Sequence, residues 1–299
     1  MIEFPVSGVE TYWWLPPLVA FLISCITATG GLSGAFLLLP FQVSVLGYTA
    51  SGVSPTNLLF SIVGIPFGVY RYCSEGRMIW PLSWVIILGT VPGMFLGALI
   101  RVYFLPDLSH FKLFVALVLA AIGINLLLDV IRNRRASKVD INRRGSSKVS
   151  DIYFSKSIVS YRFQGEYFSV STPKISLLGL FVGIVGGAYG IGGGAIMVPL
   201  IVSVMGLPVY TIAGAVLFST FIGSIGGVIF YWIIGLTSVG TYSSVSPDWA
   251  LGGLLGIGGA VGMYVGARLQ RFIPARLIKV MLTVCLLGIA VKYLSVLFF

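Results

Sequence analysis

Apolar segments long enough to form helices recur along nearly the whole chain, and this feature constrains the fold more than any other. They fall into two groups of five, near residues 15–29, 31–47, 53–72, 80–100 and 112–131, and near residues 174–190, 192–206, 208–235, 247–268 and 275–298. In lipid, only helices and closed barrels pair every backbone N–H and C=O group, and these segments are too long and too unalternating for barrel strands. Since 57% of the residues are hydrophobic and only 9% are charged, the sequence predicts an all-α, polytopic membrane helical bundle.

A polar, basic stretch separates the two groups of segments. Ten of the nineteen Lys and Arg residues lie between Arg132 and Lys174, and basic loops of membrane proteins gather on the cytoplasmic side. We therefore expect a first transmembrane repeat at 1–131, a basic cytoplasmic connector at 132–173 and a second transmembrane repeat at 174–299. Attraction to anionic lipid headgroups is a secondary interpretation, and no nucleic-acid partner is expected because the loop contains no recognition motif.

Part of this connector, DIYFSKSIVSYRFQGEYFSV at residues 151–170, alternates between apolar and polar residues. The alternation predicts a small β-hairpin with its turn near Gln164 and Gly165. A flexible cytoplasmic linker is the alternative.

The two halves repeat one sequence pattern. A shift of 159 positions lays GLSGAFLLLPFQVSVLG, residues 31–47, over GIGGGAIMVPLIVSVMG, residues 190–206, and a shift of 169 positions lays GMFLGA, residues 93–98, over GMYVGA, residues 262–267. In both halves, glycines recur every four residues around the second block: Gly89, Gly93, Gly97, Gly258, Gly262 and Gly266. Such glycines line one helix face and let another backbone approach closely, so we interpret them as a packing device.

The first two segments of each half are too short to cross the bilayer unaided. Fifteen residues at 1.5 Å each cover about 22 Å of a hydrocarbon core about 30 Å thick. Each pair therefore forms either a hairpin that turns at the glycines inside the bilayer or one interrupted helix. A hairpin, or two separate crossings, makes the two halves inverted repeats and leaves sixteen basic residues inside and three outside (Arg101, Lys112 and Lys292), against thirteen and six for interrupted helices. The positive-inside rule favours the inverted arrangement.

The glycine clusters are the strongest candidates for a substrate site, because inverted repeats with short or broken helices bind substrate near the membrane midplane. Helices that start after the glycines, at about Leu32 and Ile191, would aim free N–H groups and partial positive charge at the space between them, which suits an anion. A cation transporter would normally have an acidic residue near the centre of a segment. None of the nine acidic residues lies there, which argues against a cation as substrate. Basic residues are also absent from segment centres, so neutral donors are expected to hold the anion. The expected substrate-binding residues are Gly31, Ser33, Gly34, Gln42, Asn57, Tyr189, Gly190, Gly192, Gly193, Gly194, Ser219 and Thr220. Thr56 is a further candidate donor, and for each polar residue the alternative is a bond to a neighbouring helix.

Residues 190–227, GIGGGAIMVPLIVSVMGLPVYTIAGAVLFSTFIGSIGG, resemble the sulfite exporter TauE/SafE family, also called the toluene sulfonate uptake permeases. GGLSGAFLLLPFQVSVLG at 30–47 resembles the same pattern more weakly, with Ser33 and Ala35 where glycines are expected. The resemblance implies a permease that moves small sulfur-containing anions, such as sulfite, sulfonates or sulfoacetate, without ATP hydrolysis.

The expected function is therefore a secondary transporter of such anions in the plasma membrane, most simply an exporter. An anion channel is the nearest alternative, and a scaffold without flux is another. A membrane-embedded enzyme is disfavoured because the chain has a single histidine, His110, and no clustered carboxylates; no catalytic residue, metal or cofactor is expected. The expected partners are the anion and membrane lipid, and a homo-oligomer is left open. Cys25, Cys73 and Cys285 are interpreted as packing residues, with Cys25 touching substrate as the alternative.

Overall fold

Helices account for most of the computed structural model, which describes residues 1–29, 32–105, 107–132, 148–237, 245–269 and 275–298. The elements in these ranges are β1 (Ile2–Phe4), β2 (Val9–Thr11), α1 (Leu15–Thr29), α2 (Ala35–Ser44), α3 (Val53–Ser74), α4 (Trp80–Tyr103), α5 (Leu108–Arg132), β3 (Val149–Phe154), β4 (Ile158–Phe163), β5 (Glu166–Ser171), α6 (Thr172–Tyr189), α7 (Gly194–Met205), α8 (Val209–Thr237), α9 (Trp249–Leu269) and α10 (Ala275–Phe298). Within the described ranges, six helices (α3, α4, α5, α6, α8 and α9) are long and apolar enough to cross a membrane. They include α6, which has 18 residues, so the expectation that this segment is too short to cross was wrong for α6. The predicted polytopic helical bundle is confirmed.

The short segments form hairpins. A Cβ placed on Gly34, at the start of α2, would lie 3.0 Å from the Ser24 hydroxyl of α1, and one placed on Gly193, before α7, would lie 3.1 Å from a Val182 methyl of α6. In an uninterrupted helix, ten residues such as those between Ser24 and Gly34 would rise about 15 Å. Each second helix therefore folds back along the first, and the interrupted-helix alternative is excluded.

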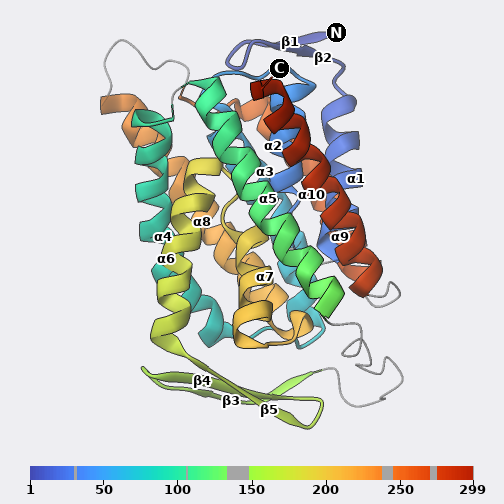
Figure 1. The fold of residues 1–299 in the computed structure, drawn as a ribbon, viewed down its shortest axis with the longest axis vertical. Coiled ribbons are helices and arrows are strands. Elements are labelled where there is room, and N and C mark those ends of the chain that lie inside the picture. Colours follow the sequence, from blue (N-terminus) through green and yellow to red (C-terminus); the bar gives the residue numbers. More distant parts are fainter. Residues whose placement is uncertain (30–31, 106, 133–147, 238–244, 270–274, 299) are drawn as a thin grey trace.

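The two halves are inverted relative to each other. Figure 1 shows α2 toward the end of the bundle that carries both chain termini, and α7 toward the opposite end, where the connector strands lie. The most extensive helix contacts all join one half to the other: α4 with α6, α1 with α9, α3 with α9, α4 with α8, α5 with α10, and α3 with α8. The helices α1 to α5 correspond in order to α6 to α10. Exchanging each helix for its counterpart turns the α4–α6 contact into the α9–α1 contact and the α3–α9 contact into the α8–α4 contact, and it leaves the α5–α10 and α3–α8 contacts unchanged. A two-fold relation between inverted repeats requires that symmetry.

Glycines permit the closest of these contacts. A side chain on Gly93 of α4 would meet the backbone carbonyl of Leu180 in α6, and one on Gly262 of α9 would meet the carbonyl of Phe21 in α1. The glycines one turn before and after each of these also face backbone atoms of the same partner helix. The interpretation of the repeated glycines as a packing device is confirmed.

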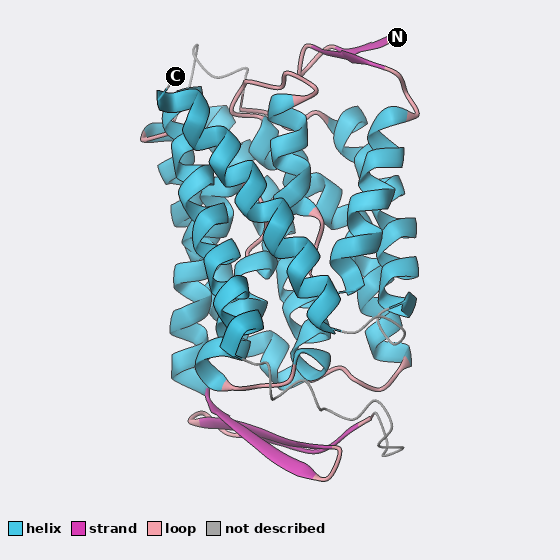
Figure 2. Cartoon of the chain, turned by 45° about the vertical axis from the view of Figure 1, so that its right-hand side comes forward, coloured by secondary structure: helices cyan, strands magenta, loops and turns pink. Residues whose placement is uncertain are grey.

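The connector contains a three-stranded antiparallel sheet in the order β3-β4-β5, which lies across one end of the helices (Figure 2). Phe163 pairs with Glu166, so Gln164 and Gly165 form a two-residue turn, and both have positive φ, 53° and 86°, as such hairpin turns require. The predicted hairpin is thus present, whereas residues 133–147 of the connector lie outside the described residues.

One side chain of this sheet reaches the helices directly. Tyr161 of β4 is fully buried, and its hydroxyl hydrogen-bonds with the Thr211 hydroxyl in the first turn of α8 at 2.8 Å. Burial raises the pKa of Tyr161 to about 12, although the Thr211 bond lowers it. The phenol therefore stays neutral at physiological pH. Its hydrogen bond to Thr211 docks the connector sheet onto the helical bundle.

The opposite end carries a second cover, the β1–β2 pair. Phe4 and Val9 are buried, and the backbone N–H and hydroxyl of Ser7 both donate to a carboxylate oxygen of Asp248. The other Asp248 oxygen accepts the N–H of Leu251 at 2.9 Å, which makes Asp248 the N-cap of α9. Strands therefore lie at both ends of the helical bundle (Figure 2).

Candidate functional site

The second glycine cluster forms a tight turn between α6 and α7. Gly190, Gly192 and Gly193 have φ of 82°, 68° and 84°, values that L-residues other than glycine seldom adopt. The N–H groups of Gly190 and Ile191 both donate to the carbonyl of Gly186, which closes the end of α6. The glycine spacing thus lets the chain reverse within a few residues and begin α7 at Gly194.

Neighbouring helices approach this turn closely. A Cβ on Gly190 would lie 2.6 Å from the Ser54 carbonyl oxygen of α3, and one on Gly192 would lie 2.6 Å from the Thr220 methyl and 2.8 Å from the Ser224 hydroxyl of α8. These distances are far shorter than van der Waals contact. A side chain at Gly190 would displace the α3 backbone, and one at Gly192 would displace the side chains of Thr220 and Ser224. The turn is enclosed by one helix from each half.

Asn57 of α3 joins the two glycine hairpins. Its side-chain amide donates to the carbonyl of Ala35, in the first turn of α2, and to the carbonyl of Gly190, both at 2.8 Å. Gln42 of α2 donates to the Asn57 side-chain oxygen at 3.1 Å, and both side chains are fully buried. A single buried amide therefore holds the start of one short helix against the turn that precedes the other.

Tyr189 makes a second link between the hairpins. Its hydroxyl, at the end of α6, donates to the carbonyl of Phe36 in α2 at 2.9 Å, and the side chain is fully buried. The start of α2 and the α6–α7 turn consequently meet in the interior of the bundle, between the two repeats. We call this region the hairpin junction: Ser33 to Phe36, Asn57 and Tyr189 to Gly194.

Three serine hydroxyls around the hairpin junction are buried and have no hydrogen-bond partner among the described residues: those of Ser24, Ser33 and Ser224. Ser24 lies beside Gly34, and Ser224 lies beside Gly192. The side-chain oxygen of Gln42 is unpartnered as well. Leaving a buried polar group unpaired costs about 1–3 kcal/mol, so such a concentration points to a place where a ligand or water supplies the missing partner.

The structure brings most of the predicted site residues to this junction, although no observation tests their role. Gly34, Asn57, Tyr189, Gly190, Gly192, Gly193 and Gly194 form it, Gln42 bonds Asn57, Thr220 lies against Gly192 and Gly194, and Ser33 precedes Gly34. Gln42, Asn57 and Tyr189 bond to neighbouring elements, as the alternative for single polar residues expected. Ser219 and Thr220 both donate to the Val216 carbonyl of their own helix, and Thr56 donates to the Gly52 carbonyl. Gly31 lies outside the described residues.

Sequence reasoning missed Ser24, Ser224 and Arg101. Ser224 follows Thr220 by four residues and so lies on the same helix face, which is a signal that could have revealed it. Ser24 carries no such signal. Arg101 is counted among the outside residues by the positive-inside rule, but in the structure it is fully buried in α4, with its Nε donating to the Ser54 hydroxyl at 3.4 Å.

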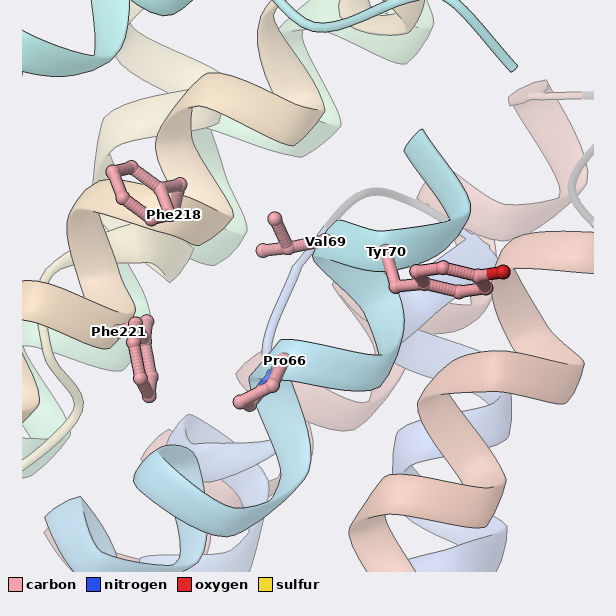
Figure 3. Close-up of a pocket in the computed structure, with 5 residues that line it drawn as sticks. All are labelled: Pro66, Val69, Tyr70, Phe218 and Phe221. Carbon is pink, nitrogen blue, oxygen red and sulfur yellow. The ribbon is translucent and has the colours of Figure 1, made fainter. Parts of the chain in front are cut away.

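A separate, apolar pocket of about 220 Å³ lies between α3 and α8. Figure 3 shows Phe218 and Phe221 of α8 facing Pro66 and Val69 of α3, and Tyr70 completes the lining. Pro66 follows Asn57 by nine residues, or about 13 Å along the helix. Because the lining offers no donor beyond the Tyr70 hydroxyl, this pocket does not suit an anion, and it is distinct from the hairpin junction.

Two inverted repeats whose short helices meet inside a membrane bundle define a protein of the transporter class. A comparison with protein families agrees: the model of the family described as "Sulfite exporter TauE/SafE" matches residues 17–293. The chain therefore belongs to the TauE/SafE family of membrane transporters, and the resemblance noted in the sequence is confirmed. Neither the search of curated proteins nor that of solved structures found a match.

Proposed function

We propose that this protein is a secondary transporter of small sulfur-containing anions, such as sulfite, sulfonates or sulfoacetate, which bind at the hairpin junction. The observation that carries the proposal is the coincidence of two helix starts, α2 and α7, with three buried serine hydroxyls that find no partner among the residues the structure describes. The first N–H groups of a helix have no carbonyl one turn earlier to accept them. The junction therefore offers hydrogen-bond donors in excess.

The electrostatics of the junction also favour an anion. Each helix start carries a partial positive charge of about half a unit, and its effect grows in an interior from which water is excluded. Asp248 is the one carboxylate that is buried among the described residues. Both of its oxygens already accept hydrogen bonds, from Ser7 and from Leu251. A pyramidal or tetrahedral oxyanion presents several acceptor oxygens and would complement these donors.

The orientation follows from charge. We place the protein in the plasma membrane with the connector, 132–173, in the cytoplasm and with the repeats 1–131 and 174–299 crossing the bilayer, because the basic residues cluster on that side. Export of the anion is the simplest direction. An anion channel would use the same donors, and only slow, saturable flux with counterflow would separate a carrier from it. That the chain catalyses no reaction stays a prediction.

The direct test is transport by purified protein in liposomes. We expect saturable uptake of ³⁵S-labelled sulfite, and accelerated uptake into vesicles preloaded with unlabelled sulfite. Sulfate, thiosulfate and sulfoacetate, each with and without a pH gradient, would define the substrate and the coupling. Protein-free liposomes are the control. Absence of flux for every one of these anions would refute the proposal.

A pair of serine variants locates the site. Ser224→Ala removes an unpartnered buried hydroxyl, so we expect a more stable protein, by about 1 kcal/mol, that nevertheless has a several-fold higher KM for the transported anion. Ser83→Ala is the control, because the buried Ser83 hydroxyl donates to the carbonyl of Ile79, the residue before α4, and lies outside the junction. If both variants leave the KM at the wild-type value, the anion binds elsewhere.

A further inference from the structure

Arg101 is a fully buried arginine in a chain that has few charges within its helices. It lies near the end of α4 and is the largest side chain in the described structure with less than 2% of its surface exposed. Burying a guanidinium in a membrane protein is expensive, and charged residues in such places usually take part in function. The position therefore requires a partner for the charge.

The contacts of Arg101 do not neutralise it. Its Nε donates to the Ser54 hydroxyl at 3.4 Å, Nη1 donates to the Leu105 carbonyl, and the guanidinium lies 3.8 Å from the centre of the Phe111 ring. These partners are all uncharged, and within the described residues no carboxylate lies within ion-pair distance. Nη2 is buried and has no hydrogen-bond partner in the part of the chain that the structure describes.

A comparison with Arg77, which is also buried in the described part of the chain, shows that this arrangement is unusual. Arg77, between α3 and α4, forms an ion pair with Glu75, and the same glutamate pairs with Arg71 at 2.7 Å. An uncompensated buried charge costs several kcal/mol. The cost at Arg101 is explained if a mobile anion, rather than a carboxylate of the chain, supplies the negative charge.

The place of Arg101 in the fold connects it to the hairpin junction. Ser54, which accepts the Nε hydrogen bond, lies in the first turn of α3, and its backbone lies directly against Gly190 of the α6–α7 turn. A cation beside a helix N-terminus is the reverse of the stabilising arrangement, because both carry positive charge. Arg101 and the start of α3 thus add to the positive potential that α2 and α7 create.

We propose that Arg101 is an anion-binding residue of the transport site, and that it holds the oxyanion on the side of the hairpin junction that faces the chain termini. This inference rests on the proposed function and changes one part of it: a cationic side chain joins the neutral donors that were expected to act alone. Two guanidinium nitrogens can donate to two oxygens of one oxyanion, a geometry that lysine cannot reproduce. The substrate class is therefore a singly or doubly charged oxyanion, and neutral analogues should not compete with it.

The repeat supplies a matched control. A shift of 169 positions aligns Arg101 with Gln270, so the second repeat has no equivalent arginine, whereas Arg268 in the last turn of α9 is exposed. Arg268→Gln removes one positive charge from the matching helix without removing a buried one. It should leave sulfite transport unchanged.

The test measures initial rates of ³⁵S-sulfite uptake in proteoliposomes for Arg101→Gln, Arg101→Lys, Arg268→Gln and the wild type. We expect Arg101→Gln to raise the KM at least tenfold and Arg101→Lys to raise it less, since lysine keeps the charge but loses the fork. A purely structural role would lower the amount of active protein and the maximal rate, with the KM unchanged. Sulfite should also raise the melting temperature of the detergent-purified wild type but not of Arg101→Gln.

Ser54→Ala is a second variant in case Arg101→Gln does not fold. It removes only the hydroxyl that orients the guanidinium, and a several-fold higher KM is expected. If wild-type protein transports sulfite and the folded Arg101→Gln has the same KM, or if Arg101→Gln does not fold and Ser54→Ala has the same KM, the role of Arg101 is refuted while the proposed function stands. If wild-type protein transports none of the four anions, the proposed function itself fails, and the role of Arg101 with it.

Discussion

At the scale of single residues, the hairpin junction depends on its glycines, which have no side chain, as much as on the hydrogen bonds of Asn57. Asn57 can bond Ala35 and Gly190 together only because Gly190 allows Ser54 to pack against the turn. The turn also leaves the Ser224 hydroxyl next to Gly192 without a partner within the described ranges. Small residues thus bring the donors together and keep them free.

Gly192→Ala should abolish transport. The new methyl group would overlap Thr220 and Ser224 and would sit on a backbone with φ of 68°, which together cost about 2–4 kcal/mol. Gly206→Ala is the control, because Gly206 has the same φ of 68° but no atom within 4 Å of an added Cβ. Sulfite flux per reconstituted protein is the measurement, after size-exclusion chromatography has shown that both variants fold. Equal flux in the two would mean that the α6–α7 turn does not line the substrate path.

At the scale of helices, the closest contacts join the two repeats rather than holding each repeat together. α4 packs along α6, and α9 packs along α1, through glycines whose partners are backbone atoms. Water cannot drive association between helices surrounded by lipid, so direct backbone contact and van der Waals packing supply the stability. Each re-entrant hairpin is therefore fixed by a long helix of the opposite repeat.

Gly93→Ala tests this packing. A methyl group there would meet the Leu180 carbonyl and the Cα atom of Gly183, so α4 and α6 must separate, at a cost of about 1–3 kcal/mol or more. Gly253→Ala in α9 is the control: nothing lies within 4 Å of its added Cβ, and alanine stabilises a helix by about 1 kcal/mol over glycine. Thermal unfolding in detergent should show a lower melting temperature for the first variant and an equal or higher one for the second. The reverse order would contradict the packing role.

The sequence was sufficient to predict the helices and the β4–β5 hairpin, but not β1, β2, β3 or every neighbour. Hydropathy predicted the helices, the repeated glycine pattern predicted the turns, and the distribution of basic residues predicted the inversion of the halves. Asn57 was a candidate from its type and position, yet its bond to Gly190 joins residues 133 positions apart. The burial of Arg101 depends on Phe111 and Ser54 packing around it, which no local pattern records.

At the scale of the whole molecule, both ends of the bundle are covered by strands. Tyr161 of the connector sheet bonds Thr211 at the start of α8, and Ser7 of the N-terminal cover bonds Asp248 at the start of α9. In the proposed transport, a substrate must reach the hairpin junction from both sides, so the two repeats must open to each side in turn. Because each cover is bonded to the start of a long helix of the second repeat, we expect the covers to move with that repeat.

The inverted arrangement makes one prediction about the two covers that no parallel arrangement makes. Both chain termini lie at the end opposite the connector sheet (Figure 1), and we have proposed that the basic connector lies in the cytoplasm. In a background with Cys25, Cys73 and Cys285 replaced by alanine, a membrane-impermeant maleimide should label Val6→Cys in intact cells. The same reagent should label Ser157→Cys only after permeabilisation, since both positions are exposed in the structure but lie at opposite ends. The cysteine-free protein should label under neither condition. Labelling of both cysteines from the same side would contradict the inversion, because an even number of crossings in each repeat would put the N-terminus and the connector together.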